Sequence, residues 1–314
     1  MSSKDMNDND MSSDDMRNND MNDNNTNSDG MNAEQFDNLA KMLAQSNFEN
    51  GCKSGNPDKK KVCALANRLL EIIFPGYFTE EKPDRKSVEE LYSLLNSQIC
   101  LALEFHAEKP SWTKEEKEAE SRRICKKFFE KLPDVKKLVK TDIEAAYDGD
   151  PAAKSYEEII LAYPGITAST ISRIAHELYL LDVPIIPRMM TEYAHSATGI
   201  DIHPGAYLGK YFFIDHGTGI VIGETSVIGD HVKIYQGVTI GALSTRGGQK
   251  LAGVKRHPTI ENNVTIYSGA SVLGGKTVIG ENSVIGGNVF ITSSIPANTR
   301  VSNKIPELDY KTEQ

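Results

Sequence analysis

The chain has 314 residues and a formal net charge of −9 at pH 7, and it is long enough for two domains that each bury a core. Residues 1–30 contain eight Asp against two basic residues, so most of the negative charge lies there and the remainder is nearly balanced. The charge distribution has no basic stripe, which argues against binding to nucleic acid or to an anionic membrane, and it does not support a broadly acidic surface.

Residues 1–30 form a low-complexity segment rich in Asn, Asp and Ser, in which Met recurs at five-residue spacing (Met1, Met6, Met11, Met16 and Met21). Such a composition buries too little apolar surface to offset the entropy of ordering, so we predict a disordered tail over residues 1–30. The Met spacing is either a binding motif or low-complexity drift, and the composition favours drift.

The sequence contains no secretory signal, no transit peptide and no stretch of roughly 20 apolar residues, so a cytoplasmic location is expected. Its four cysteines lie in the first half of the chain (Cys52, Cys63, Cys100 and Cys125). None of them belongs to a Cys-x-x-Cys motif, so we expect reduced, structural thiols rather than a metal site.

Residues 31–199 are predicted to form an α-helical domain. Ser87-Val-Glu-Glu and Thr113-Lys-Glu-Glu have the pattern of capping boxes that open amphipathic runs. Further helices are expected in three segments (155–162, 167–180 and 186–195). The prolines of this region are expected between helices (Pro110, Pro133, Pro151 and Pro164).

An aliphatic side chain returns every sixth residue over most of the chain that follows (Ile202, Leu208, Ile214, Ile222, Ile228, Ile234, Ile240, Ile260, Ile266, Val272, Ile279, Ile285 and Ile291). A six-residue step scatters side chains around an α-helix but keeps them on one face of an extended chain. Hexapeptide repeats are typical of β-helices, in which the repeated residue fills the shaft. We therefore predict an α+β chain with a β-helix over residues 200–302, in preference to a β-sandwich, and a short tail over 303–314.

Three intervals in this repeat exceed six residues (eight from Ile214 to Ile222, twenty from Ile240 to Ile260, and seven from Val272 to Ile279). A regular coil takes three hexads, so each excess marks chain that leaves the shaft. The long interval predicts an extruded loop over residues 246–259. The shortest excess predicts a one-residue bulge beside Gly274.

His216 lies in the first break, and its imidazole is suited to general base catalysis near neutral pH. Gly219 follows Asp201 by three hexads, so one coil step of roughly 4.8 Å would bring the carboxylate of Asp201 near the loop of His216. We predict that His216 is catalytic and that Asp201 supports its positive form. Two alternatives are that His216 only hydrogen-bonds its own turn and that His203, more simply a surface corner residue, is the base.

No two histidines have the spacing His-x-x-x-His or His-x-x-x-x-His, so a protein-held metal is not expected. No Gly-rich phosphate loop follows a strand and opens a helix, so nucleoside triphosphate chemistry is not indicated. Two alternatives to an enzyme that uses His216 as a base are a non-catalytic β-helix scaffold and a metal-dependent hydratase with three histidines.

Four stretches carry a family resemblance (Tyr163-Pro-Gly through Arg173-Ile-Ala-His-Glu-Leu-Tyr179, Asp201-Ile-His-Pro204, Ile214-Asp-His-Gly-Thr-Gly-Ile-Val-Ile-Gly-Glu-Thr225, and Arg256-His-Pro258). They resemble serine O-acetyltransferases, the enzymes of cysteine biosynthesis that make O-acetylserine from L-serine and acetyl-CoA. The resemblance covers about residues 135–302. Many acyltransferases share the hexapeptide repeat, whereas Asp-Ile-His-Pro followed by Asp-His-Gly-Thr-Gly is specific.

The resemblance implies a left-handed β-helix and a role for each matching residue. His216 would be the general base on the serine hydroxyl, and Asp201 would be its carboxylate partner. The implied substrate contacts are two carboxylates for the ammonium group and two residues at the carboxylate group (Asp150 and Asp215, then Arg256 and His257). Acetyl-CoA is the implied co-substrate, and neither a permanently bound cofactor nor a metal is expected.

Coenzyme contacts are expected at Gly241, Ala242 and Ser268, and backbone N–H groups near Gly241 are candidate donors to the oxyanion. Direct acetyl transfer is expected, because the β-helix contains no cysteine to form an acyl-enzyme. The family's Gly-Gly-Thr-Gly is replaced by Gly241-Ala-Leu-Ser-Thr245, which leaves the details of coenzyme binding and loop closure open.

The resemblance implies a homotrimer with active sites between neighbouring subunits, and leaves a hexamer built through the helical domains open. The sequence does not decide whether L-cysteine inhibits competitively by sharing the serine site. The family's C-terminal tail, which ends in an Ile that docks into cysteine synthase, has no counterpart at residues 309–314, so no stable complex with that partner is expected.

Overall fold

The computed structural model describes four stretches of the chain (33–44, 55–80, 82–105 and 112–304). The chain divides into two compact units, Met1–Ser54 and Gly55–Gln314. In the first unit the structure describes helix α1, Ala33–Ala44. The predicted disordered tail lies outside the described residues, as does the end of the chain from residue 305.

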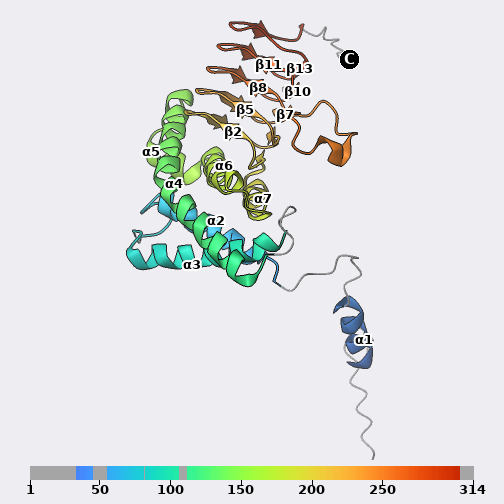
Figure 1. The fold of residues 1–314 in the computed structure, drawn as a ribbon. Helices are drawn as coiled ribbons and strands as arrows, with labels where there is room; N and C mark the ends of the chain where they lie inside the picture. Colours follow the sequence, from blue (N-terminus) through green and yellow to red (C-terminus); the bar gives the residue numbers. More distant parts are fainter. Residues whose placement is uncertain (1–32, 45–54, 81, 106–111, 305–314) are drawn as a thin grey trace, which may run out of the picture. The chain divides into compact units, whose positions relative to one another are not determined.

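The described part of the second unit begins with helices: α2 (Lys59–Ile73), α3 (Arg85–Ala102), η1 (Leu103–Phe105), α4 (Lys114–Gly149), α5 (Tyr156–Ala162), α6 (Pro164–Leu180) and α7 (Ile186–Thr198). Figure 1 shows these helices at one end of the unit and the strands at the other. The helices expected at 155–162 and 186–195 are therefore found as α5 and α7. Helix α6 begins at Pro164, three residues earlier than expected, because proline suits the first helical position, where no N–H donor is needed.

Helix caps decide where α3 and α4 begin. Thr113 caps α4 as predicted, in a capping box with Glu116. The cap of α3 is Asp84 rather than the predicted Ser87, which lies three residues inside the helix and completes the box with its hydroxyl. Asp caps as well as Ser does, so the box starts one turn earlier.

Pro133 lies inside α4, so the prediction that it separates helices was wrong. Proline in a helix interior removes a hydrogen bond and crowds the preceding turn, at a cost of about 3 kcal/mol. Its neighbours Leu132 and Val135 are 7% and 1% exposed and belong to the helical core. Their burial stabilises the continuous helix by about 1.5–3 kcal/mol each, which offsets the cost.

The remainder of the unit is a stack of short strands: β1 (Asp201–Ile202), β2 (Tyr207–Leu208), β3 (Phe213–Asp215), β4 (Val221–Ile222), β5 (Val227–Ile228), β6 (Lys233–Tyr235), β7 (Thr239–Gly241), β8 (Thr259–Ile260), β9 (Thr265–Ile266), β10 (Ser271–Leu273), β11 (Val278–Ile279), β12 (Val284–Ile285), β13 (Phe290–Ile291) and β14 (Arg300–Val301). They form sheet A (β1-β4-β7-β10-β13), sheet B (β2-β5-β8-β11) and sheet C (β3-β6-β9-β12-β14). Strands of successive coils pair in parallel, so the predicted β-helix is confirmed.

The register of sheet A follows the predicted breaks. Thr239 pairs with Val221 at the regular offset of three hexads. The offset from Asp201 to Val221 is two residues longer, which is the excess of the first break. Ser271 pairs with Thr239 across the long loop, which lengthens that offset by fourteen residues, and the bulge lengthens the offset from Ser271 to Phe290 by one.

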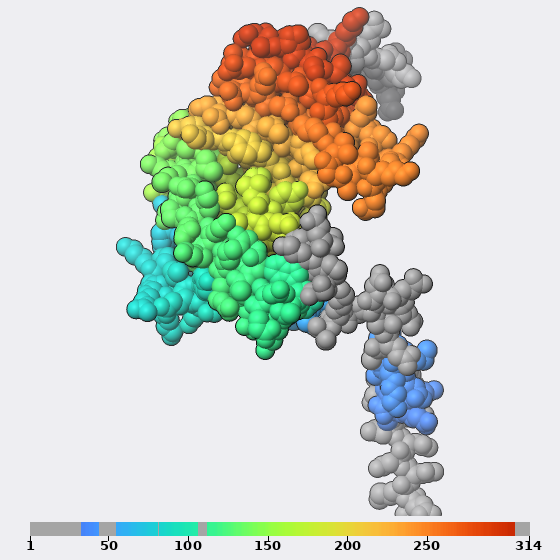
Figure 2. All heavy atoms as spheres, in the orientation of Figure 1, coloured from blue at the N-terminus to red at the C-terminus, as the bar shows by residue number. Residues whose placement is uncertain are grey.

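The long break leaves the shaft between β7 and β8, as predicted, and contains the short helix η2 (Gly248–Leu251). Figure 2 shows this segment as an orange lobe that projects beside the shaft. The predicted bulge follows β10, where Gly274 has a φ of 103°. A Cβ on Gly275 would lie 2.2 Å from the carbonyl oxygen of Lys255, so the bulge packs directly against the base of the loop.

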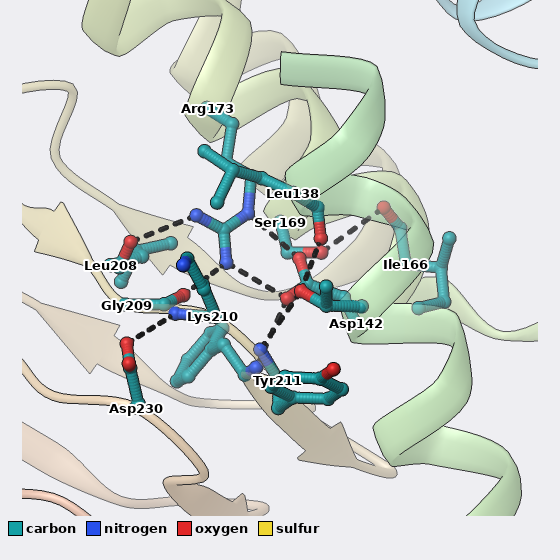
Figure 3. A network of polar contacts seen from close by, with 12 residues as sticks. Leu138, Asp142, Ile166, Ser169, Arg173, Leu208, Gly209, Lys210, Tyr211 and Asp230 are labelled. Carbon is teal, nitrogen blue, oxygen red and sulfur yellow. Dashed lines mark hydrogen bonds and ion pairs between the residues drawn. The ribbon is translucent and has the colours of Figure 1, made fainter. Parts of the chain in front are cut away.

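A buried ion pair joins the helices to the first coil (Figure 3). Arg173 and Asp142 have side chains that are 4% and 0% exposed, and they form two hydrogen bonds of 2.7 and 2.8 Å. Arg173 also donates to the carbonyl oxygens of Leu208 and Gly209, and Asp142 accepts from the backbone N–H of Phe212. The pair therefore satisfies the backbone at the turn that leads into β3.

Cys63 and Cys100 are half-buried free thiols, and burial raises the pKa of Cys125 to about 12. Cys52 lies outside the described residues. Among the helices that the structure describes, none combines the length and the hydrophobicity that a membrane span requires. The cytoplasmic location stays a prediction.

Candidate active site

Two corners of the shaft carry the residues singled out by the sequence. The acid–base corner lies between sheets C and A. It comprises five residues (Asp150, Tyr163, Asp215, His216 and Lys233). The arginine corner lies between sheets A and B (His203, Glu224, Thr225, Arg256 and His257).

His216 follows β3 directly and points away from the apolar shaft. Its side chain is 75% exposed, and its Nε2 atom lies 3.8 Å from Oδ1 of Asp215. Its φ of 58° recurs at other corners, for example at His231, so it belongs to the turn geometry. A Cβ on the next residue, Gly217, would lie 2.5 Å from Ile200, so only glycine lets the loop turn so close to the shaft.

Asp150 ends helix α4 and reaches the same corner. Its Oδ2 atom accepts a 2.6 Å hydrogen bond from the hydroxyl of Tyr163, and its Oδ1 atom accepts from the N–H of Ala152. The bond from Tyr163 is the largest cause that lowers the pKa of Asp150, and the charges of Lys233 and His216 act in the same direction. The same bond raises the pKa of Tyr163 to about 12. Asp150 is therefore an ionised carboxylate held by a protonated tyrosine.

Lys233 is a residue of this corner that the sequence analysis missed. Its Nζ donates to the carbonyl oxygen of Gly149 at 2.6 Å and lies 3.7 Å from Oδ2 of Asp215. It thus connects the end of α4 to β3. The repeat could have placed it there, because Ile214 and Ile234 are repeat positions on neighbouring coils. Their pairing brings Lys233 beside Phe213, in the strand that ends in Asp215.

Asp201 was predicted to stack beside Gly219, and this register was wrong. The two extra residues of the first break place Asp201 beside Val221 instead. Among the described residues no hydrogen bond or ion pair joins Asp201 to His216. The carboxylate lies 4.0 Å from the guanidinium of Arg188 on α7.

Asp201 also belongs to a group with Glu192 and His195 whose potential ligand atoms lie within 4.8 Å of one another. The guanidinium of Arg188 pairs with both carboxylates of this group and already supplies a positive charge there. Arg188 therefore offsets one of the two negative charges of this group.

At the arginine corner, Arg256 is held by two residues of the preceding coil. Its Nη2 atom donates to Glu224, and its backbone N–H donates to the hydroxyl of Thr225 at 2.9 Å. Burial raises the pKa of Glu224, but the hydrogen bond from Arg256, the nearby charges and the hydrogen bond from Tyr179 together outweigh it, so the net shift of the pKa is downward. The guanidinium thus lies beside an ionised carboxylate.

His257 lies at the same corner and is 7% exposed. Its Nδ1 atom accepts from the backbone N–H of Thr225 at 3.1 Å, which fixes the ring and leaves the proton on Nε2. Burial, followed by the charge of Arg256, lowers the pKa of His257 to about 4. Burial also lowers the pKa of His203, the rival base, whose Nδ1 accepts from Gly205. Both imidazoles are therefore neutral at pH 7.

The expected coenzyme residues are divided between the two corners. Gly241 ends β7 and Ala242 follows it, so both lie on the side of sheet A that faces the arginine corner. Ser268 follows β9 and lies two coils beyond His216 on the acid–base corner, roughly 10 Å along the shaft. A single chain does not bring these three residues together.

The same division separates His216 from Arg256. Sheet A lies between the two corners. The chain needs about five residues to cross this face, which corresponds to roughly 16 Å of extended backbone. The structure brings Asp150, Asp215 and His216 together at one corner. It brings Arg256 and His257 together at the other.

Comparisons with known proteins agree on one family. Residues 89–170 match the family model described as serine acetyltransferase, N-terminal. The chain is 44% identical over 216 residues to a plasmid serine acetyltransferase of Synechococcus elongatus, an alignment that covers 64% of this chain and 68% of the relative. It is 47% identical over 122 residues to the serine acetyltransferase of Bacillus subtilis, covering 39% of this chain and 54% of that one.

Solved structures are similar over most of the chain. The crystal structure of serine acetyltransferase isoform 3 from Entamoeba histolytica in complex with cysteine gives a TM-score of 0.69 at 38% identity, covering 88% of this chain and 93% of that one. Serine acetyltransferase 1 of the same organism, in complex with L-cysteine, gives a TM-score of 0.67 at 38% identity and covers 84% of this chain and 95% of that one.

Proposed function

The chain belongs to the serine acetyltransferase family of acyltransferases, and we propose that it transfers the acetyl group of acetyl-CoA to the hydroxyl of L-serine. The products are O-acetyl-L-serine and CoA, in the first step of cysteine biosynthesis from serine. The observation that carries this proposal is the acid–base corner, where an exposed imidazole lies beside Asp215 and close to the ionised Asp150. Anions that attract an ammonium group, next to a base that can take a hydroxyl proton, suit an amino alcohol.

In this proposal His216 is the general base. The serine hydroxyl is too weak an acid to ionise at neutral pH, so a base must take its proton as it attacks the thioester carbonyl. Such assistance accelerates a reaction by about 10²- to 10⁴-fold. The protonated His216 then returns the proton to the departing thiolate. Asp201 is proposed to support the imidazolium.

The remaining groups of the substrate are proposed to bind at both corners. Asp150 and Asp215 hold the ammonium group, and the guanidinium of Arg256 holds the carboxylate in a planar fork. His257 supports the second interaction, because its neutral ring presents an N–H donor at the corner. Lys233 offsets part of the negative charge, so the pair of aspartates suits a single ammonium.

We propose that the active site is shared by neighbouring subunits of a homotrimer. One chain holds the acid–base corner and the arginine corner roughly 16 Å apart along a face of the shaft. A cyclic trimer with heterologous contacts can place one corner of each subunit against the other corner of the next. The division of Gly241, Ala242 and Ser268 between the corners supports the same arrangement for acetyl-CoA.

Direct transfer from acetyl-CoA to serine is proposed, because the β-helix holds no cysteine to carry the acetyl group. Backbone N–H groups near Gly241 are proposed to stabilise the tetrahedral oxyanion. L-Cysteine is proposed to compete with serine, since it has the same ammonium and carboxylate groups, and it is the ligand in two similar structures. The predicted lack of a stable complex with cysteine synthase concerns residues outside the described part of the chain.

Release of thiol from acetyl-CoA tests the proposal directly. The purified protein is expected to release CoA when L-serine is added and to be silent without an acceptor. Activity on a sugar or on another amine, but not on serine, would assign a different substrate to the same fold. Silence with every acceptor would refute the proposal.

A further inference from the structure

Glu224 is held from both sides at the arginine corner. Its Oε1 atom accepts a 3.1 Å hydrogen bond from the hydroxyl of Tyr179, at the end of helix α6. Its Oε2 atom accepts from the guanidinium of Arg256, which lies one coil further along the shaft. The three side chains form a chain of hydrogen bonds that runs from the helical domain to the arginine proposed to bind substrate.

Gly205 leaves room for the contact between Tyr179 and Glu224 because it has no side chain. A Cβ on Gly205 would lie 2.9 Å from Cζ of Tyr179 and 2.9 Å from Cγ of Glu224. Real Cβ contacts are essentially never this short, so a side chain at position 205 would force Tyr179 or Glu224 to shift. Gly205 therefore lets Tyr179 and Glu224 meet over the first corner.

The charge arrangement makes the orientation of Arg256 matter. The side chains of Glu224 and Arg256 are each 24% exposed, so their interaction is partly shielded from water. A free arginine side chain samples many rotamers, and a guanidinium that is already fixed loses less conformational entropy when a second carboxylate binds. The hydrogen bond from Tyr179 to Oε1 of Glu224 fixes the carboxylate, and the carboxylate in turn fixes the guanidinium of Arg256.

We propose that Tyr179 is a positioning residue which, through Glu224, fixes the guanidinium of Arg256 for the carboxylate of the amino-acid substrate. This inference rests on the proposed function, because it takes Arg256 as the carboxylate contact. It makes a specific demand: loss of the Tyr179 hydroxyl weakens recognition of the substrate carboxylate and leaves the rest of the reaction unchanged. A purely structural role, joining α6 to the first two coils, would instead lower stability and affect all ligands alike.

The test compares Tyr179→Phe with the matched variant Tyr193→Phe, which also loses a hydroxyl bond, the 2.8 Å one to Asn67 between two helices. The KM for L-serine is expected to rise about 5- to 10-fold in Tyr179→Phe, the effect of losing one hydrogen bond of typical strength. The KM for acetyl-CoA is expected to stay within about 2-fold. Tyr193→Phe is expected to leave both constants unchanged.

L-Serinamide, which keeps the amine and the hydroxyl but lacks the carboxylate, isolates the group that is recognised. Its inhibition constant against L-serine needs no turnover and is expected to be the same in wild type and Tyr179→Phe. Glu224→Asp keeps the charge but shortens the side chain by one methylene, so it is expected to raise the KM for serine in the same selective way. Equal losses for serine, serinamide and acetyl-CoA in Tyr179→Phe would overturn the proposal.

Arg256→Ala separates failure of the inference from failure of the proposed function. If Arg256→Ala weakens serine but not serinamide, Arg256 is the carboxylate contact, and an unchanged KM for serine in Tyr179→Phe then overturns the positioning role alone. If Arg256→Ala weakens both ligands equally, the assignment of Arg256 in the proposed function fails, and the inference fails with it.

Discussion

Gly223 and His257 lie on neighbouring coils so closely that a Cβ on Gly223 would be 2.1 Å from the imidazole ring. The ring is fixed on its other side by the N–H of Thr225. The absence of a side chain at position 223 therefore determines where His257 lies.

Gly223→Ala is accordingly expected to displace the His257 ring. Overpacking of this kind costs about 1–3 kcal/mol in the free energy of unfolding. We expect kcat/KM for serine to fall about tenfold or more, because a displaced group no longer meets the substrate. Gly76→Ala is the control: Gly76 has a φ of 84°, and no heavy atom lies within 4 Å of the position that a Cβ would take, so this variant is expected to lose stability but not activity. Unchanged kinetics in Gly223→Ala would show that the position of His257 does not matter.

His216→Ala is expected to reduce kcat by about 10²-fold or more, since the reaction loses its base. The side chain is 75% exposed, so the midpoint of thermal unfolding should change little. His231→Ala is the matched control, because His231 is also exposed, with a φ of 58° at a corner, and stacks on Tyr211. Steady-state rates of thiol release would refute the role of His216 if both variants behaved alike.

Arg173→Met is expected to destabilise the protein by about 3–5 kcal/mol, because it leaves the carboxylate of Asp142 buried without its partner. Arg85→Ala breaks an exposed ion pair with Glu89 and is expected to cost less than about 1 kcal/mol. Urea unfolding measures both free energies. Similar values for the two variants would contradict the structural role given to the buried pair.

The lowered pKa of His257 predicts a dependence of stability on pH. In the unfolded state His257 binds a proton below pH 6.5, whereas in the folded state it does so only near pH 4. The unfolded state therefore binds more protons between these two values, and the free energy of unfolding is at its full value above pH 6.5 and decreases as the pH falls toward 4. Between pH 7 and pH 5 the wild type should lose about 2 kcal/mol more than His257→Gln, which does not titrate there. If both proteins lost the same free energy of unfolding between pH 7 and pH 5, a buried, neutral His257 would be contradicted.

The β-helix could be predicted almost strand by strand, because the six-residue period is local and each repeated side chain fills the shaft. The excess of each break reappears in the register of the paired strands. The long loop separates Glu224 from Arg256 and Thr225 from His257 by the same offset as the paired residues Thr239 and Ser271, so the same arithmetic brings both pairs together. Arg256 was expected to contact the substrate, and its hydrogen bond to Glu224 was not predicted.

Other features depend on packing that no local pattern encodes. Tyr163 meets Asp150, and Lys233 meets Gly149, because α4 and α6 pack against the first coil. Pro133 stays within α4 because the core on both sides stabilises the helix. The expected partnership of Asp201 with His216 relied on a regular coil of three hexads, where the chain has a coil that is two residues longer.

His216 of one subunit is proposed to act with Arg256 of another. Mixing His216→Ala and Arg256→Ala subunits tests this most directly, because each variant keeps the corner that the other lacks. Refolded together in equal amounts, they should form trimers in which about a quarter of the sites combine two intact corners, and thiol release should recover to about a quarter of the wild-type rate. Activity of the mixture that stays at the level of the separate variants would contradict a site shared between subunits.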